Sequence, residues 1–147
     1  MAANQEGRIL SLHICVGHFE PMKDAESVEV LTGFGIKGDR HASEHPARRR
    51  RQVLLMDKET LDHFGLEQGQ IRENITTDGI DLASLPRGQQ ISLGDDVVLE
   101  ITGDCEPCAF IEGIRDGLRA EIEGKRGMLA YVTTGGSLKV GDAVKPV

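Results

Sequence analysis

The alternation of apolar and polar residues indicates a chain built mainly from short β-strands. Period-two patterns and short apolar runs bounded by turn residues are typical of strands. Glycine occurs 18 times and is spread along the chain, as expected where many short strands need turns. We predict hairpin turns at Gly94-Asp95 and Gly135-Gly136. The predicted strands are 8–16, 27–31, 52–56, 71–76, 90–93, 97–102, 129–133 and 137–140, with a final edge strand at 143–145.

Two segments follow the longer period of a helix. The first is capped by Asp57 and runs through Phe64, with Gly65 as its stop signal. The second runs from Pro107 to about Glu123, because its apolar residues keep helical spacing. Many short strands with only two helices predict a mainly β fold, closed or strongly bent into a barrel-like structure.

Size, charge and composition narrow the class of protein. A chain of 147 residues suits a single domain, residues 1–147, with its own hydrophobic core. The net charge of -7 and the scarcity of aromatic residues argue against nucleic-acid binding. No apolar run approaches the ~20 residues that cross a bilayer, so we expect no membrane association. Residues 1–7 lack the pattern of a secretory signal, which makes the cytoplasm the expected location.

Three cysteines are too few, and odd in number, for a disulfide framework. Cys15 lies in an apolar run and is interpreted as a buried core thiol. The basic run Arg48–Arg51 is an exception in an acidic chain, and we interpret it as a solvated loop or strand edge.

The segment Cys105-Glu106-Pro107-Cys108 carries the strongest chemical signal. Proline suits the first turn of a helix, so Cys108 is predicted to lie among the unpaired N–H groups at the positive end of the helix dipole. Such a position favours the thiolate, which attacks, carries sulfur or binds a soft metal. Cys108 is therefore the main candidate for a catalytic or metal-ligating residue, and Cys105 is the second.

The same cysteine pair allows other interpretations. A zinc site needs two further ligands, for which His41 and His45 are the nearest candidates in type. A thiol–disulfide switch also fits a Cys-x-Pro-Cys segment at a helix start, although the alternating strands and helices of a thioredoxin fold are absent. Two buried structural cysteines are a third interpretation, which suits Cys105 better than Cys108.

A glycine-rich segment, residues 33–41, offers a second candidate group. Its glycines permit close approach of a ligand, and Asp39, Arg40 and His41 place an acid, a guanidinium and an imidazole side by side. The alternative is a turn held by a bond from Asp39 to the backbone, with Arg40 exposed.

Two further segments carry candidate anion-binding residues. If 71–76 is a strand, Arg72 and Asn74 share one face, which suits an anion or the edge of a heterocycle. The alternative is a solvent-facing polar side of a sheet. Arg126, beside Gly127, is either an anion contact or a cation that stabilises the end of the preceding helix.

Taken together, these segments resemble the MOSC domain, named for the C-terminal part of molybdenum cofactor sulfurases. The matching runs extend from about Arg8 to the end of the chain, and they resemble the small stand-alone bacterial members. They are residues 35–41, 51–55, 72–82, 93–94, 98–102, 105–108, 126–127 and 135–144.

The resemblance implies a barrel-like β fold and one reactive cysteine, corresponding to Cys108. In the family this thiol carries sulfur as a persulfide or ligates molybdenum in a pterin cofactor. Arg72 and Asn74 match the family's Arg-x-Asn element near the pterin site, and residues 39–41 match its Gly-Asp-x-x segment. Cys105 would resolve a persulfide or disulfide on Cys108, or have no role. The chain lacks the long N-terminal domain of the larger members, which contributes cofactor contacts.

The leading hypothesis is a MOSC protein that uses Cys108 for sulfur handling or for molybdenum-pterin binding. Arg72, Asn74, Asp39, Arg40, His41 and Arg126 would hold the anionic pterin or a substrate. The expected partners are a cysteine desulfurase or a cofactor-accepting protein, together with the small-molecule pterin. The alternatives are a non-catalytic delivery module, a zinc-stabilised structural domain, and a molybdenum-dependent reductase of N-hydroxylated substrates with an electron-donor partner.

Overall fold

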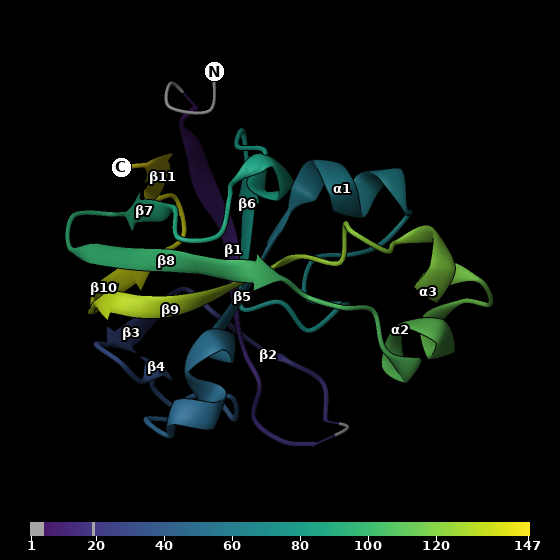
Figure 1. The fold of residues 1–147 in the computed structure, drawn as a ribbon, viewed down its shortest axis with the longest axis horizontal. Helices are drawn as coiled ribbons and strands as arrows, with labels where there is room; N and C mark the ends of the chain where they lie inside the picture. The colour runs from purple at the N-terminus through teal and green to yellow at the C-terminus, as the bar shows by residue number, and fades with distance from the viewer. Residues whose placement is uncertain (1–4, 19) are drawn as a thin grey trace.

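The strands of the computed structural model form one closed sheet and one small open sheet (Figure 1). The structure describes residues 5–18 and 20–147, so residues 1–4 of the N-terminal segment considered above lie outside it. The strands are β1 (Gly7–Ile14), β2 (Lys23–Ala25), β3 (Ser27–Leu31), β4 (Gly35–Ile36), β5 (Val53–Asp57), β6 (Ile75–Asp78), β7 (Gln90–Leu93), β8 (Val97–Asp104), β9 (Met128–Thr134), β10 (Gly136–Lys139) and β11 (Ala143–Pro146).

Pairing of β1 with β11 closes the larger sheet into a barrel. The order β11-β7-β8-β9-β5-β6-β1 returns to β11 through the pairs Gly7–Val144 and Arg8–Ala143. Farther along its length, β1 pairs with the short strand β2. The apolar side chains that alternate along these seven strands fill the interior, as in other small barrels. The predicted mainly β, barrel-like fold is confirmed.

The small sheet has the order β10-β3-β4 and is antiparallel. Its buried residues, Val28, Val30, Ile36 and Leu138, belong to the same apolar cluster as the barrel interior. Strands β3 and β7 have the bounds predicted from the sequence, whereas the short strands β2 and β4 were not predicted. Strands of two or three residues are too short to show an alternation of apolar and polar positions.

The helix α1 (Lys58–His63) forms where the sequence predicts it. The carboxylate of Asp57 accepts hydrogen bonds from the Thr60 backbone N–H, at 3.0 Å, and from the Thr60 hydroxyl, at 2.7 Å. Leu61 and Phe64 are buried, and Gly65 follows in the left-handed conformation. Local capping and one apolar face were sufficient signals for this helix.

The prediction of one helix from Pro107 to Glu123 is wrong. The segment forms two short helices, α2 (Ala109–Ile114) and α3 (Leu118–Glu121), separated by extended Arg115 and left-handed Gly117. The Glu112 carboxylate accepts hydrogen bonds from the backbone N–H groups of Gly117 and Arg119, which lower the pKa of Glu112 below its ordinary value. The glycine and this side-chain cap therefore replace the interrupted helical hydrogen bonds.

Two other local predictions are corrected. Residues 71–74 form a turn and an irregular segment, and the strand begins only at Ile75. The basic run lies in a 3₁₀ helix, η2 (Pro46–Arg51), not in a loop or strand edge, but its arginines are exposed as expected. A second 3₁₀ helix, η3, spans Leu82–Ser84.

A second apolar cluster anchors the α2–α3 hairpin beyond the end of β8 (Figure 1). Leu61 and Phe64 of α1 pack there with Ile111 of α2 and with Leu118 and Ile122 of the α3 segment. This packing fixes the segment that carries Cys108. Within the described residues, no helix has the length and apolar character needed to span a membrane.

We expect Asp57→Ala to lower the free energy of unfolding by about 1 kcal/mol, because the first turn of α1 loses its cap. Asp62→Ala in the same helix is the control. It removes only an exposed ion pair to Lys58 and should cost less than about 0.5 kcal/mol. Denaturant unfolding of both variants measures the difference, and equal losses would contradict the role of the cap.

Candidate functional site

The barrel end that faces the α2–α3 hairpin carries a cavity of about 280 Å³. Seven of the eight residues predicted to form the site line it, although they come from four separate stretches of the chain. They are Arg40, His41, Arg72, Asn74, Cys105, Cys108 and Arg126. Asp39 is the exception, and it lies directly behind the lining.

The two cysteines of the Cys-x-Pro-Cys segment differ in exposure. Cys108 is exposed, whereas Cys105 is buried with 5% of its surface accessible, and neither forms a disulfide. Cys108 is the N-cap residue of α2, with extended backbone and no capping bond from its side chain. The helix begins at Ala109, two residues later than predicted, and Pro107 precedes it, but Cys108 lies at the N-terminal end of the helix as predicted. The thiol owes its accessibility to the cavity and the position of the hairpin.

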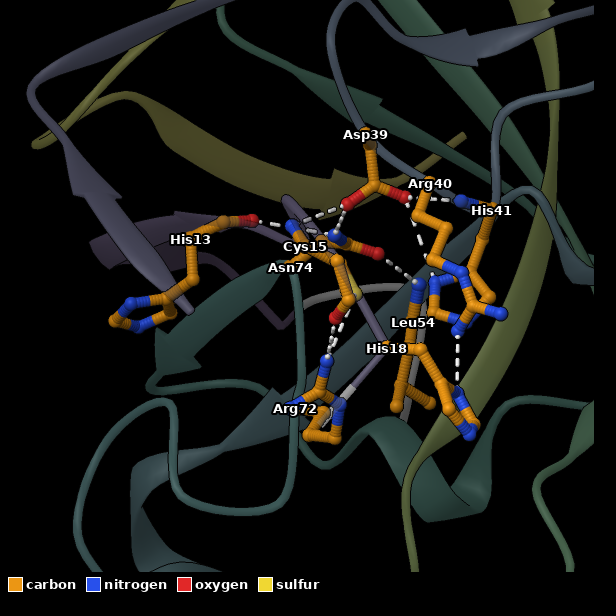
Figure 2. Close-up of polar contacts among 10 residues, drawn as sticks. His13, Cys15, His18, Asp39, Arg40, His41, Leu54, Arg72 and Asn74 are labelled. Atoms are coloured by element: carbon orange, nitrogen blue, oxygen red, sulfur yellow. Dashed lines mark hydrogen bonds and ion pairs between the residues drawn. The ribbon is translucent and has the colours of Figure 1, made fainter. Parts of the chain in front are cut away.

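The carboxylate of Asp39 forms the polar centre behind the cavity (Figure 2). Its Oδ1 accepts hydrogen bonds from the Cys15 backbone N–H, at 2.6 Å, and from Asn74 Nδ2, at 2.9 Å. Its Oδ2 accepts the backbone N–H of His41 at 3.0 Å. Gly38 precedes it with a φ of 88°, a conformation that glycine adopts without strain. The turn interpretation of Asp39 is therefore confirmed.

Asn74 joins this carboxylate to two strands of the barrel. Its Oδ1 accepts the N–H of Leu54 in β5 at 3.0 Å, and its Nδ2 also donates to the carbonyl of His13 in β1 at 3.2 Å. Both atoms of the side-chain amide are used, and the residue is 2% exposed. We define the Asp39–Asn74 pair as the polar clamp. It holds residues 39–41 in place against the ends of β1 and β5.

Arg72 fastens the segment between β1 and β2 beside the cavity (Figure 2). Its Nη1 donates to the Glu20 carbonyl at 2.8 Å, and its Nη2 donates to the Gly17 carbonyl and to Cys15 Sγ, both at 3.0 Å. Its φ of 68° is unusual for a residue other than glycine. Cys15 is fully buried, as predicted, but it contacts this guanidinium in addition to the apolar core.

Arg126 is the most unusual side chain of the cavity. It is only 5% exposed, and its Nε and Nη1 have no hydrogen-bond partner among the described residues. The hydrogen bond from the Cys105 backbone N–H to the Gly127 carbonyl, at 2.8 Å, places Arg126 beside the cysteine segment. A buried guanidinium without partners is costly unless an anion completes it.

Several lining residues were not selected as site residues from the sequence. Arg51, at the end of η2, adds a further guanidinium, and His18 contacts Arg40 through its Nδ1 at 2.9 Å. Phe110 lies under the Arg72 guanidinium, 5.7 Å from the ring centre. Arg51 was detectable in the basic run, whereas His18 and Phe110 had no local signal.

The charge of the lining is opposite to that of the chain. The described lining contains one carboxylate, Glu106, and four guanidinium groups, those of Arg40, Arg51, Arg72 and Arg126. The chain as a whole has a net charge of -7. The lining therefore carries mainly positive charge, and it includes an exposed thiol. Across residues 5–18 and 20–147, no group of three or more His, Cys, Asp or Glu side chains is arranged to hold a metal ion, so the zinc interpretation gains no support.

Comparison with known protein families assigns the fold. The MOSC domain profile matches residues 38–145, which include every element of the cavity except the β1–β2 segment. The chain therefore belongs to the MOSC domain family, which is associated with molybdenum cofactor binding or sulfuration. No curated protein matches the sequence significantly.

Solved structures share the fold at low sequence identity. The YuaD protein from Bacillus subtilis matches with a TM-score of 0.80 and 20% identity, over 96% of this chain and 95% of its own. YiiM from Geobacillus stearothermophilus gives 0.74 and 16%, over 96% of this chain and 75% of its own. YiiM from Escherichia coli gives 0.64 and 18%, over 95% and 69%.

We expect Asn74→Ala to destabilise the protein by about 3 kcal/mol, because it leaves the Leu54 N–H and part of the Asp39 carboxylate without partners in a buried region. Gln89→Ala is the control, since its amide also bonds to backbone carbonyls but at the rim of the barrel, and it should cost about 1 kcal/mol. Denaturant midpoints measure both. A loss for Asn74→Ala no larger than the control would contradict the clamp.

Proposed function

We propose that the cavity binds a molybdenum-pterin cofactor, with Cys108 as the protein ligand of the metal. The observation that supports this most directly is the pairing of an exposed thiol with a buried guanidinium, Arg126, that has no partner of its own. Thiolate is a soft ligand suited to this metal, and a guanidinium binds phosphate through two parallel hydrogen bonds. The residues present thus match both ends of an anionic, metal-carrying pterin.

Each part of the lining has a separate task in this proposal. Arg126 binds the phosphate, and Arg40, Arg51 and His41 add positive charge or donors at the mouth. Leu54, Phe110 and Leu129 exclude water from the space beside the thiol. The polar clamp and Arg72 act as positioning groups, because their donors and acceptors are already paired within the protein. When bound, the metal centre would supply oxygen-atom transfer or redox chemistry.

The first test is molybdenum and pterin analysis of protein produced in a molybdenum-replete host. Wild type should carry both, Cys108→Ser should lose the metal, and Arg126→Gln should retain about tenfold less pterin because the buried cation is gone. Cys105→Ser is the matched thiol control and should keep most of both. Wild-type protein that contains neither molybdenum nor pterin would overturn the proposal.

A sulfur carrier is the second candidate, favoured by the two thiols, Cys105 and Cys108, that line one cavity. The Cys108 thiolate would attack the outer sulfur of a cysteine desulfurase persulfide. The donor S–S bond breaks, the desulfurase leaves as a thiolate, and Cys108 becomes the persulfide, so no external oxidant is needed. For delivery, a thiolate of the cofactor-accepting protein attacks the outer sulfur on Cys108, the S–S bond breaks, and Cys108 leaves as a thiolate. The reducing cytoplasm predicted from the sequence suits this chemistry.

Mass spectrometry after incubation with a cysteine desulfurase and cysteine tests the carrier. We expect wild type to gain the mass of one sulfur atom, Cys108→Ser to gain none, and Cys105→Ser to gain it with slower turnover. An unmodified Cys108 would exclude the carrier. Equal activation of a partner by wild type and Cys108→Ser would instead favour a non-catalytic delivery module.

A further inference from the structure

A second cavity adjoins the thiol cavity on the side of η2. Its volume is about 530 Å³, and it lies between the segment 40–43 and the start of the 3₁₀ helix. The polar residues that line it are Arg40, His41, Ser43, His45 and Arg48. Arg40 and His41 also line the thiol cavity, so the two spaces share one wall. The described lining contains no carboxylate, although the chain has 24 acidic residues against 17 basic ones.

Hydrogen bonds inside the segment set the direction of its donors. His45 Nδ1 accepts the Ala47 backbone N–H at 3.1 Å, so in a neutral ring the proton lies on Nε2, which becomes a donor. Ser43 Oγ accepts the His45 backbone N–H at 3.1 Å, which leaves its hydroxyl hydrogen to be donated. The imidazole and the hydroxyl thus each present a donor, and the neutral imidazole has no acceptor position left.

The guanidinium of Arg48 completes this set. Two other exposed arginines of the chain pair with carboxylates, Arg8 with Asp78 and Arg115 with Glu121. Across residues 5–18 and 20–147, no carboxylate lies within 4.0 Å of the Arg48 or Arg40 guanidinium. Two arginines with no carboxylate partner therefore border a space that also presents neutral donors.

We propose that this second cavity is a phosphate-binding site. The site offers hydrogen-bond donors from two guanidinium groups, a hydroxyl and an imidazole N–H. A carboxylate has only two oxygens to accept these bonds, whereas the three terminal oxygens of a phosphoryl group accept them all. The phosphoryl group is either free phosphate or pyrophosphate, or part of a small molecule such as a nucleoside 5′-phosphate. This site does not involve Cys108, so it goes beyond the function proposed above.

Isothermal titration of the purified full chain with inorganic phosphate, pyrophosphate and guanosine 5′-monophosphate at low salt tests the site. Arg126→Gln serves as the background, so that binding in the thiol cavity does not obscure the result. We expect Arg48→Ala, an exposed residue, to weaken binding about tenfold, and Ser43→Ala to weaken it about threefold. Arg50→Ala is the matched control on the same helix, because Arg50 lines neither cavity, and it should leave the affinity unchanged.

The outcomes separate the proposal from its rivals. Tighter binding of the nucleotide than of pyrophosphate identifies a nucleotide site, and the reverse order identifies a site for free phosphates. No measurable binding of any probe, or an equal loss for Arg48→Ala and Arg50→Ala, overturns the proposal. Retention of binding by Cys108→Ser is expected and keeps this result independent of any failure to find molybdenum or persulfide.

Discussion

The buried carboxylate of Asp39 is the interaction on which the site depends. It receives hydrogen bonds from Cys15, His41 and Asn74, and thereby joins three segments that are far apart in the sequence. A carboxylate excluded from water is costly unless its oxygens are satisfied, so these partners hold one another in a single arrangement. Asn74 extends the constraint to β5 through Leu54. Arg40 and His41 reach the cavity only because their backbone is fixed there.

Arg126 is a buried cation in an acidic protein, and the backbone at Gly127 explains its position. Gly127 has a φ of 121°, and a Cβ at this position would lie 2.9 Å from the Leu55 carbonyl, so the chain passes close to β5 and carries Arg126 inward. Burial removes water from the guanidinium and strengthens its attraction for a charged group. The thiol of Cys108 stands in the same cavity but remains exposed. The cavity thus combines a buried cation with an accessible thiol.

Sequence patterns over a few residues predicted those elements that neighbouring residues stabilise, and those strands in which buried and exposed side chains alternate clearly. The α1 cap, the strands β3 and β7, and the burial of Cys15 follow from residues near each other in sequence. The strand predicted at 71–76 failed because Arg72 bonds to carbonyls of the β1–β2 segment in a conformation that no local pattern encodes. The long helix failed because the Glu112 carboxylate caps α3 from within the same segment.

The sequence by itself determined the mainly β class and singled out eight candidate site residues, Cys108 among them, because alternation, turns and residue chemistry can be recognised in short stretches. Only the tertiary structure decided that seven of those residues share one cavity, that Asp39 works behind it, and that Arg126 is buried without a partner. Strand pairing and barrel closure bring these residues together. They join positions separated by almost the full length of the chain, and no local hydrophobic pattern extends over that distance.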